Sequence, residues 1–289
     1  MPSTISVIGA LLSQVAFVTG VLYYFGWAYS HAYFAYFGVD AGALGFTTQE
    51  YVLRSLNSLF RPGMFTLLAI LVLLAGRWLP ELHARWSRRP RRTLRRWVEV
   101  TGTIGVALTA AVAIVMFVPT SVAGPVGIYA PFVLLAGMVC LGFASRLRWK
   151  YRSLLGIRAP RTAADVVASK TRILVLIAVG MVAYVWAVAA YADRRGLDDA
   201  QHAASDHFID KPSILVFSVD RLGIDGAGAQ VGEITMPGEK YRYVYSGLWL
   251  LARTTDRYYL LPQLWQAKTD RVFVIKDGDT IRVDIARNP

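Results

Sequence analysis

The stretch Arg88-Arg89-Pro90-Arg91-Arg92 is the densest run of positive charge in the chain, and it lies between long apolar runs. Residues 77–97 hold eight arginines and one acid, and residues 146–172 hold six arginines, two lysines and one acid. Each segment carries a net charge of +7, and the rest of the chain sums to −2 because the total is +12. Such clustering is typical of the cytoplasmic loops of a polytopic membrane protein.

The composition supports this interpretation. Hydrophobic residues make up 55% of the chain and charged residues 17%, whereas about a quarter of a soluble domain is charged. A helix that crosses a bilayer needs roughly 20 mainly apolar residues. We therefore predict a bundle of five transmembrane helices, at residues 5–29, 63–79, 98–118, 124–144 and 173–191.

The two basic segments also predict how the chain is threaded. If both are cytoplasmic, the N-terminus lies inside, and residues 30–62 and everything after residue 191 lie outside. The chain then divides into a transmembrane domain at 1–191, a linker or helical extension of the fifth span at 192–211, and an extracytoplasmic domain at 212–289. The predicted location is the cytoplasmic membrane, crossed several times.

Aromatic residues gather at the outer end of the first predicted span. Tyrosine and tryptophan favour the headgroup level of a bilayer because each has an apolar body and a polar tip. We interpret five of them as a membrane-interface belt: Tyr23, Tyr24, Trp27, Tyr33 and Tyr36. An aromatic-lined ligand site is the alternative.

A helix-start signal follows this aromatic segment. Thr47-Thr48-Gln49-Glu50 matches the capping box, and apolar residues at helical spacing follow it. The pattern predicts an amphipathic helix at residues 47–60, ended by Pro62 and lying on the outer membrane surface.

The C-terminal segment has a strand pattern. Alternating apolar runs predict a small antiparallel β domain of five or six strands, at residues 213–219, 241–245, 248–253, 257–261, 271–275 and 280–285. Ser246-Gly247 breaks one run, and Asp277-Gly278 predicts a hairpin. A domain of about 75 residues is small for a self-sufficient core, so we expect it to pack on the membrane or on a second copy.

The linker carries the most suggestive polar pattern. Asp198, His202, Asp206 and Asp210 recur every four residues and would share one helix face. Carboxylates and imidazole are ligands for zinc and other divalent ions. The spacing matches no closed metal motif, however, and a solvated linker face is the simpler interpretation.

Charged side chains suggest two further roles. Glu99 lies within a predicted span, and an ion pair with Arg95 or Arg96 is the simple interpretation, with a sensing carboxylate as the alternative. The basic run Arg88, Arg89, Arg91 and Arg92 is suited to anionic lipid headgroups. We do not expect nucleic acid binding, because the basic residues flank spans and do not cover a folded face.

The sequence contains no enzyme signature that we recognise. There is no Gly-x-Ser-x-Gly, no His-Glu-x-x-His and no P-loop, and no cofactor is expected.

The third predicted span is rich in small residues, from Gly102 to Ala113. This composition favours packing within a helix bundle or, alternatively, a pore lined by the helices of an oligomer.

Several short motifs resemble a known group of sequences. Tyr24-Phe25-Gly26-Trp27, Ala32-Tyr33-Phe34 and Phe37-Gly38-Val39-Asp40 are similar to the N-terminal stretch of uncharacterised polytopic membrane proteins of bacteria, actinobacteria in particular. The resemblance covers about the first 60 residues and implies no activity. Taken together, the sequence favours a non-enzymatic binding, sensing or scaffolding protein with an extracytoplasmic partner. A channel or transporter subunit, as a homo-oligomer, is the alternative.

Overall fold

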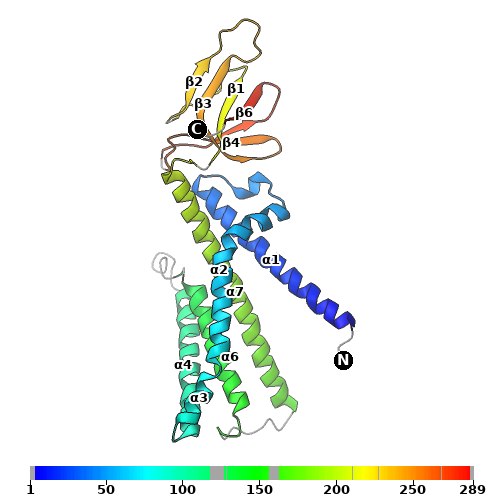
Figure 1. The fold of residues 1–289 in the computed structure, drawn as a ribbon, viewed down its shortest axis with the longest axis vertical. Helices are drawn as coiled ribbons and strands as arrows, with labels where there is room; N and C mark the ends of the chain where they lie inside the picture. The colour runs from blue at the N-terminus through cyan, green and yellow to red at the C-terminus, as the bar shows by residue number, and fades with distance from the viewer. Residues whose placement is uncertain are drawn as a thin grey trace. The chain divides into compact units, whose positions relative to one another are not determined.

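The computed structural model describes residues 4–117, 127, 129–155, 163–209, 211–226, 228–267 and 269–286. The chain forms two compact units (Figure 1), one made of Met1–Ser58 with Ala192–Pro289 and the other of Leu59–Tyr191. We call these the terminal unit and the middle unit. The two ends of the chain therefore belong to the same unit.

Long helices form the middle unit. They are α2 (Thr48–Gly76, from Leu59 onward), α3 (Leu79–Trp86), α4 (Pro90–Phe117), α6 (Ala130–Lys150) and α7 (Ala163–Ser205, as far as Tyr191). Helices α4 and α6 pack on each other through small residues. A Cβ atom at Gly105 would lie 2.8 Å from Leu141 Cγ, and one at Gly137 would lie 2.9 Å from Thr109 Oγ1, so the two backbones approach closely.

Four segments of the described residues are long and apolar enough to cross a membrane: Gly63–Trp86, Pro90–Phe117, Ala130–Lys150 and Lys170–Ser205. These segments contain the whole of the second and fifth predicted spans. They also contain the third predicted span as far as Phe117 and residues 130–144 of the fourth. The first predicted span lies in helix α1 (Thr4–Tyr36), which is not among the four, so a total of five spans stays a prediction.

One helix boundary differs from the prediction, and one open alternative is decided. The predicted helix at 47–60 does begin with a capping box, since Glu50 N–H donates to Thr47 Oγ1 at 3.3 Å and Thr47 N–H donates to Glu50 Oε2 at 2.7 Å. Its end at Pro62 is wrong, because α2 continues to Gly76. Proline loses one backbone hydrogen bond, but its fixed φ fits a helix. The predicted linker is helical as far as Ser205.

The C-terminal part of the terminal unit is an antiparallel sheet, as predicted. Its strands are β1 (Ser213–Ser218), β2 (Gln230–Glu233), β3 (Tyr243–Arg253), β4 (Arg257–Pro262), β5 (Phe273–Lys276) and β6 (Ile281–Ala286). Their order is β5-β4-β3-β1-β6, with β2 paired to β3 as well. The Asp277-Gly278 hairpin is wrong, because β5 pairs with β4 and β6 pairs with β1.

The short link from β5 to β6 requires a strongly bent sheet. The end of β5 lies beside the start of β4, and the start of β6 lies beside the end of β1. These positions correspond to opposite ends of β3, about 33 Å apart if β3 were straight. Residues 277–280 can bridge at most about 18 Å. The sheet therefore curls, which brings the end of β5 and the start of β6 within reach of this link.

Gly247 lies at the predicted break and provides the bend in one continuous strand, β3. Its φ is 72°, a left-handed value, and the registers with β1 and β4 both shift nearby. A Cβ atom at Gly247 would lie 2.0 Å from the carbonyl oxygen of Gly228. Only glycine fits this position.

The curled sheet contributes to two cores. One lies within the sheet and contains Ile214, Val216, Ile224, Tyr245, Leu248, Tyr258, Leu260 and Ile275. The other joins the sheet to the end of α1, to the short helix η1 (Ala41–Leu44) and to the end of α7. Its buried residues are Tyr33, Phe34, Phe37, Val39, Ala41, Leu44, Ala200, Phe208, Trp249, Leu251, Tyr259, Leu261 and Trp265. We call this second core the collar.

Helix α1 crosses its neighbours in the terminal unit at two glycines. A Cβ atom at Gly26 would lie 1.9 Å from the Tyr51 carbonyl oxygen, and one at Gly196 would lie 2.4 Å from the Tyr29 carbonyl oxygen. Near the second crossing the Tyr29 hydroxyl donates to Asp199 Oδ2 at 3.1 Å. These contacts fix the collar to α2 and α7.

Candidate functional site

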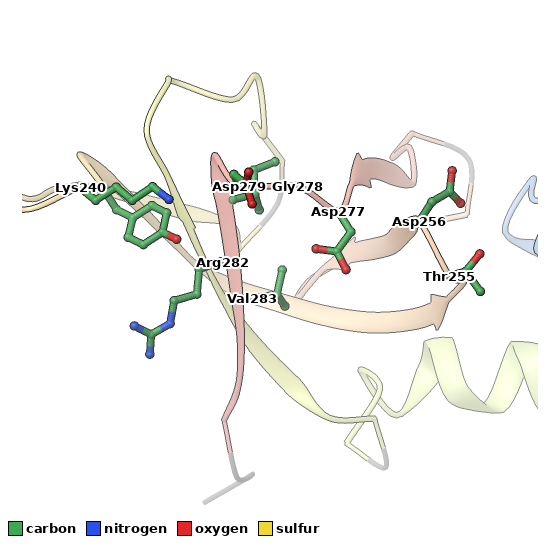
Figure 2. A pocket seen from close by; sticks show the side chains of 10 residues that line it. Lys240, Thr255, Asp256, Asp277, Gly278, Asp279, Arg282 and Val283 are labelled. Carbon is green, nitrogen blue, oxygen red and sulfur yellow. The ribbon is translucent and has the colours of Figure 1, made fainter.

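A polar pocket opens beside the link that joins β5 to β6 (Figure 2), and we call it the seam pocket. Its volume is about 520 Å³, within the range of small-molecule sites. Three segments that are distant in sequence contribute its lining: Lys240, Tyr241, Thr255, Asp256, Asp277, Gly278, Asp279, Ile281, Arg282 and Val283. The bend in β3 brings these segments together.

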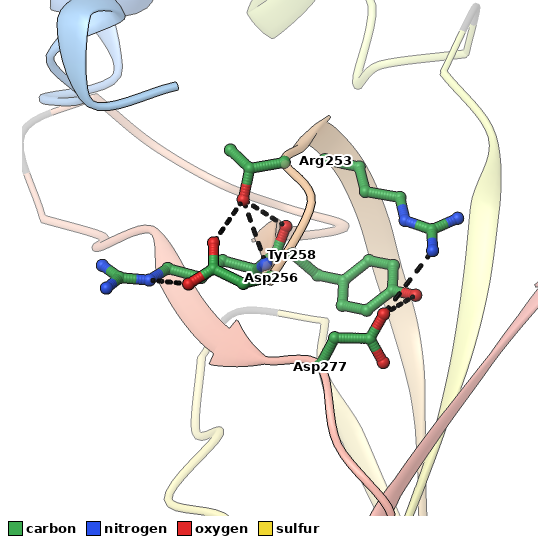
Figure 3. Close-up of polar contacts among 6 residues, drawn as sticks. Arg253, Asp256, Tyr258 and Asp277 are labelled. Carbon is green, nitrogen blue, oxygen red and sulfur yellow. Dashed lines mark hydrogen bonds and ion pairs between the residues drawn. The ribbon is translucent and has the colours of Figure 1, made fainter. Parts of the chain in front are cut away.

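Asp277 is held by two side chains at the end of β5 (Figure 3). The Tyr258 hydroxyl donates to Asp277 Oδ2 at 3.2 Å, and Arg253 Nη2 lies 3.5 Å from the same oxygen. The Arg253 guanidinium also lies over the Tyr258 ring, 5.0 Å from its centroid. Burial raises the pKa of Tyr258, Arg253 opposes the increase, and Asp277 adds to it. The carboxylate is therefore already paired.

Asp256 is fixed within the β3–β4 turn (Figure 3). The Thr254 hydroxyl donates to Asp256 Oδ1 at 3.1 Å, and Arg257 Nε lies 3.4 Å from Asp256 Oδ2. The backbone N–H of Asp277 donates to the Asp256 carbonyl oxygen at 2.7 Å, which connects this turn to the β5–β6 link. The acidic side of the pocket is thus built from two segments joined by a backbone hydrogen bond.

The basic side of the pocket comes from β6 and from the residues before β3. Arg282 donates from Nε and Nη2 to Asp284, at 2.9 and 2.8 Å, and these bonds raise the pKa of Arg282. Lys240 Nζ lies 5.6 Å from the centroid of the Tyr241 ring. Lys240 and Asp279 take part in no ion pair among the described residues.

Three of the five charges in the lining are matched by residues outside it. Arg253, Arg257 and Asp284 neutralise Asp277, Asp256 and Arg282 respectively. One carboxylate, Asp279, and one ammonium, Lys240, are left to interact with a ligand. Both residues are exposed, so they are accessible from solvent.

The predicted linker stripe is only partly covered by the described residues. Asp198, His202 and Asp206 are exposed, and His202 Nδ1 lies 2.7 Å from the Asp198 carbonyl oxygen. Asp210 falls outside the described residues. No group of three metal-ligating side chains occurs in the part of the chain that the structure describes. That part offers no support for a metal site, and the stripe as a whole stays untested.

The five residues of the predicted aromatic belt fall into two groups, three that are exposed and two that pack in or against the collar. Tyr23, Tyr24 and Trp27 are between 37% and 40% exposed. Tyr33, in contrast, is buried in the collar, and Tyr36 packs edge-on against Trp265, with 5.9 Å between the ring centroids. For Tyr33 and Tyr36, packing under the sheet is therefore an alternative to a place at the headgroups.

The charged residues of the middle unit lie as follows. Arg88, Arg89, Arg91 and Arg92 are exposed around the start of α4, and the last three line a hollow of about 380 Å³ together with Pro90. Arg95 Nε donates to Glu99 Oε1 at 2.8 Å, which is the intrahelical ion pair that the spacing predicts.

Sequence reasoning missed the seam pocket. Asp277 and Asp279 stand out in the sequence only as residues of an expected hairpin, and Lys240 and Arg282 carry no recognisable signal. Their proximity depends on the bend at Gly247 and on the pairing of β5 and β6 with different strands. No local spacing encodes that arrangement.

The chain was compared with protein-family models, curated proteins and solved structures, and none of them matches it. The chemistry of the site therefore rests on its geometry. That geometry offers charge pairing and hydrogen bonding at an accessible surface pocket, which are the properties of a binding site.

Proposed function

We propose that this chain is a multi-pass protein of the bacterial cytoplasmic membrane, with its N-terminus inside and its sheet outside. In this proposal the sheet binds an extracytoplasmic ligand in the seam pocket without transforming it. The observation that carries the proposal is the pair of opposite charges, Asp279 and Lys240, that stay unmatched among the described residues while the other charges of the pocket are neutralised.

The apolar helices support the membrane location. Lys170–Ser205 has 36 residues, which corresponds to about 54 Å of helix, whereas the hydrocarbon core of a bilayer is about 30 Å thick. The end of α7 would thus extend beyond the bilayer toward the sheet that follows it in sequence. The two basic segments favour the predicted orientation.

The chemistry of the lining favours binding over catalysis. Its described residues include no histidine, cysteine or serine that could act as base or nucleophile. Asp256 and Asp277 already form ion pairs with Arg257 and Arg253.

A pore through the small-residue helices has less support. The hydroxyls of Thr101, Thr103 and Thr109 donate to carbonyl oxygens of their own helix. Gly105 and Gly137 are used in contacts between α4 and α6 of the same chain. The small residues thus serve packing inside one protomer.

Sidedness can be tested with single cysteines. In a Cys140→Ser background, which removes the one native cysteine, we expect Asp225→Cys to react with a membrane-impermeant maleimide on intact cells. Arg88→Cys should react only after the membrane is permeabilised. The opposite pattern would mean that the topology is inverted and that the proposed location is wrong.

Binding in cells can be tested with a photo-crosslinking amino acid at Tyr241, which lines the pocket, and at Asp225, which does not. We expect a discrete adduct from position 241 only. The adduct should disappear when Lys240→Gln and Asp279→Asn are combined. Equal labelling from both positions, or an adduct that survives the double variant, would refute binding at the seam pocket.

A further inference from the structure

We infer that the seam pocket recognises a small zwitterion, a molecule that carries one ammonium and one anionic group. This inference rests on the proposed function and specifies the chemistry of its ligand. It follows from the charges that remain after the internal pairs of the pocket are counted.

The charge balance of the lining selects the class of ligand. Of five charged side chains in the lining, Asp256, Asp277 and Arg282 are paired with residues outside it. A simple cation would pair with Asp279 but leave Lys240 unmatched, and a simple anion would do the reverse. A ligand that carries both charges pairs with both residues and leaves the pocket neutral.

The two unmatched groups are presented by different segments. Lys240 precedes β3, and Asp279 belongs to the β5–β6 link, yet both line the same pocket (Figure 2). They do not form an ion pair with each other, which requires 4.0 Å or less. A molecule with separated charges can therefore lie between them.

The residues around the two charges are held in place. Asp256 and Asp277 are joined by a backbone hydrogen bond of 2.7 Å, and Ile281 N–H donates to the Gly278 carbonyl oxygen at 3.0 Å. The link that carries Asp279 is therefore folded into a turn. A preformed site loses less entropy when it binds a small molecule.

Two sources could supply such a ligand: a free amino acid or short peptide, with a carboxylate, and a phosphoethanolamine headgroup, with a phosphate. The test uses the full chain in nanodiscs of phosphatidylglycerol, whose headgroup is anionic and carries no ammonium group to pair with Asp279. Glycylglycine and phosphoethanolamine are titrated separately at about pH 5, where the phosphate carries mainly one negative charge, and saturation-transfer NMR of the ligand measures binding.

We expect saturable binding of at least one of the two zwitterions, with a dissociation constant in roughly the millimolar range because both residues are exposed. Blocking one charge, as in N-acetylglycylglycine or glycylglycine amide, or in phosphoethanolamine acylated on nitrogen, should weaken binding about tenfold. Lys240→Gln and Asp279→Asn should each have the same effect. Lys276→Gln and Asp225→Asn, outside the pocket, should change the affinity less than about twofold.

Binding of glycylglycine alone would identify a peptide or amino acid source, and binding of phosphoethanolamine alone a headgroup source. Equal binding of blocked and free ligands, no saturable signal from either zwitterion, or full affinity in both pocket variants would overturn the inference. If zwitterions fail but the crosslinked adduct at position 241 persists, the ligand class is wrong while the proposed binding role stands.

Discussion

Gly247 shows how one residue controls the sheet. A side chain there would meet the Gly228 carbonyl at 2.0 Å and would require a left-handed backbone at φ 72°. We expect Gly247→Ala to destabilise the sheet by at least about 2 kcal/mol, from backbone strain and the clash together. Hydrogen exchange of β3 peptides, measured by mass spectrometry, reports this loss.

Gly223→Ala is the matched control for that change. A Cβ atom at Gly223 would have no heavy atom within 4 Å, and the residue does not have a left-handed backbone. Unchanged protection in both variants would contradict the role assigned to Gly247.

Tyr245 is a second residue with a specific structural role. Its buried hydroxyl accepts the Leu222 N–H at 2.6 Å and donates to the Leu222 carbonyl oxygen at 2.9 Å. Tyr245→Phe leaves the Leu222 N–H unpaired, whereas the Leu222 carbonyl oxygen still accepts the Ile224 N–H at 2.8 Å, and the change should cost about 1–3 kcal/mol. Faster hydrogen exchange in the β1–β2 loop of this variant would show the loss of stability. Tyr243→Phe is the control, because it removes a hydroxyl from the same strand without touching the Leu222 backbone, and it should leave the loop unchanged.

The same tyrosine predicts a pH effect. Burial raises the pKa of Tyr245 above its ordinary value of 10.0, so the folded state favours the neutral hydroxyl. Stability is then fully present below about pH 10 and is lost as pH rises through the folded pKa, because the unfolded chain releases this proton first. The difference in tyrosinate absorbance between wild type and Tyr245→Phe should appear only above pH 10; a difference already complete at pH 10 would contradict the shift.

At the scale of elements, an engineered disulfide can test the packing of α4 against α6. A Cβ atom at Gly102 would lie 3.8 Å from Ala144 Cβ, close to the mean separation in disulfides. In a Cys140→Ser background, Gly102→Cys with Ala144→Cys should therefore crosslink within one chain on mild oxidation. A gel shift checks this, and Gly142→Cys in place of Ala144→Cys is the control, since a Cβ atom at Gly142 has no neighbour within 4 Å.

Most of the helices and strands could be predicted from the sequence. The capping box placed the start of α2, and alternation placed most strands, because both signals are local. The end of α2 and the Asp277-Gly278 hairpin were wrong for a shared reason. Pro62 and Asp277-Gly278 are local signals that tertiary structure overrides: α2 continues, and β5 and β6 find other partners.

At the scale of the whole molecule, the collar joins the two ends of the chain. Phe37 contacts the rings of Tyr33, Phe208 and Trp265, with centroid distances between 5.1 and 5.8 Å. We expect Phe37→Ala to cost about 3–5 kcal/mol and to reduce exchange protection in β3 and β4, far away in sequence. Trp27→Ala, an exposed aromatic of α1, should leave those strands protected, and equal loss from both variants would contradict the coupling.

The sequence indicated that the sheet is small for a self-sufficient core. The structure gives it one core of its own and a second one shared with helices, and this partner was not predictable. The expected support was the membrane surface or a second copy, whereas the structure uses residues of α1, η1 and α7. Aromatic side chains suit a headgroup layer and a protein core equally well. The seam pocket was hidden for a related reason, since its residues become neighbours only after β3 bends.

The collar also has a consequence for biosynthesis. Phe37 leaves the ribosome long before Trp265, and at about 5–20 residues per second the delay is roughly 10–45 s. During most of that interval the aromatic end of α1 has none of its strand neighbours, so we expect insertion machinery, lipid or a chaperone to shield it until the strands are synthesised.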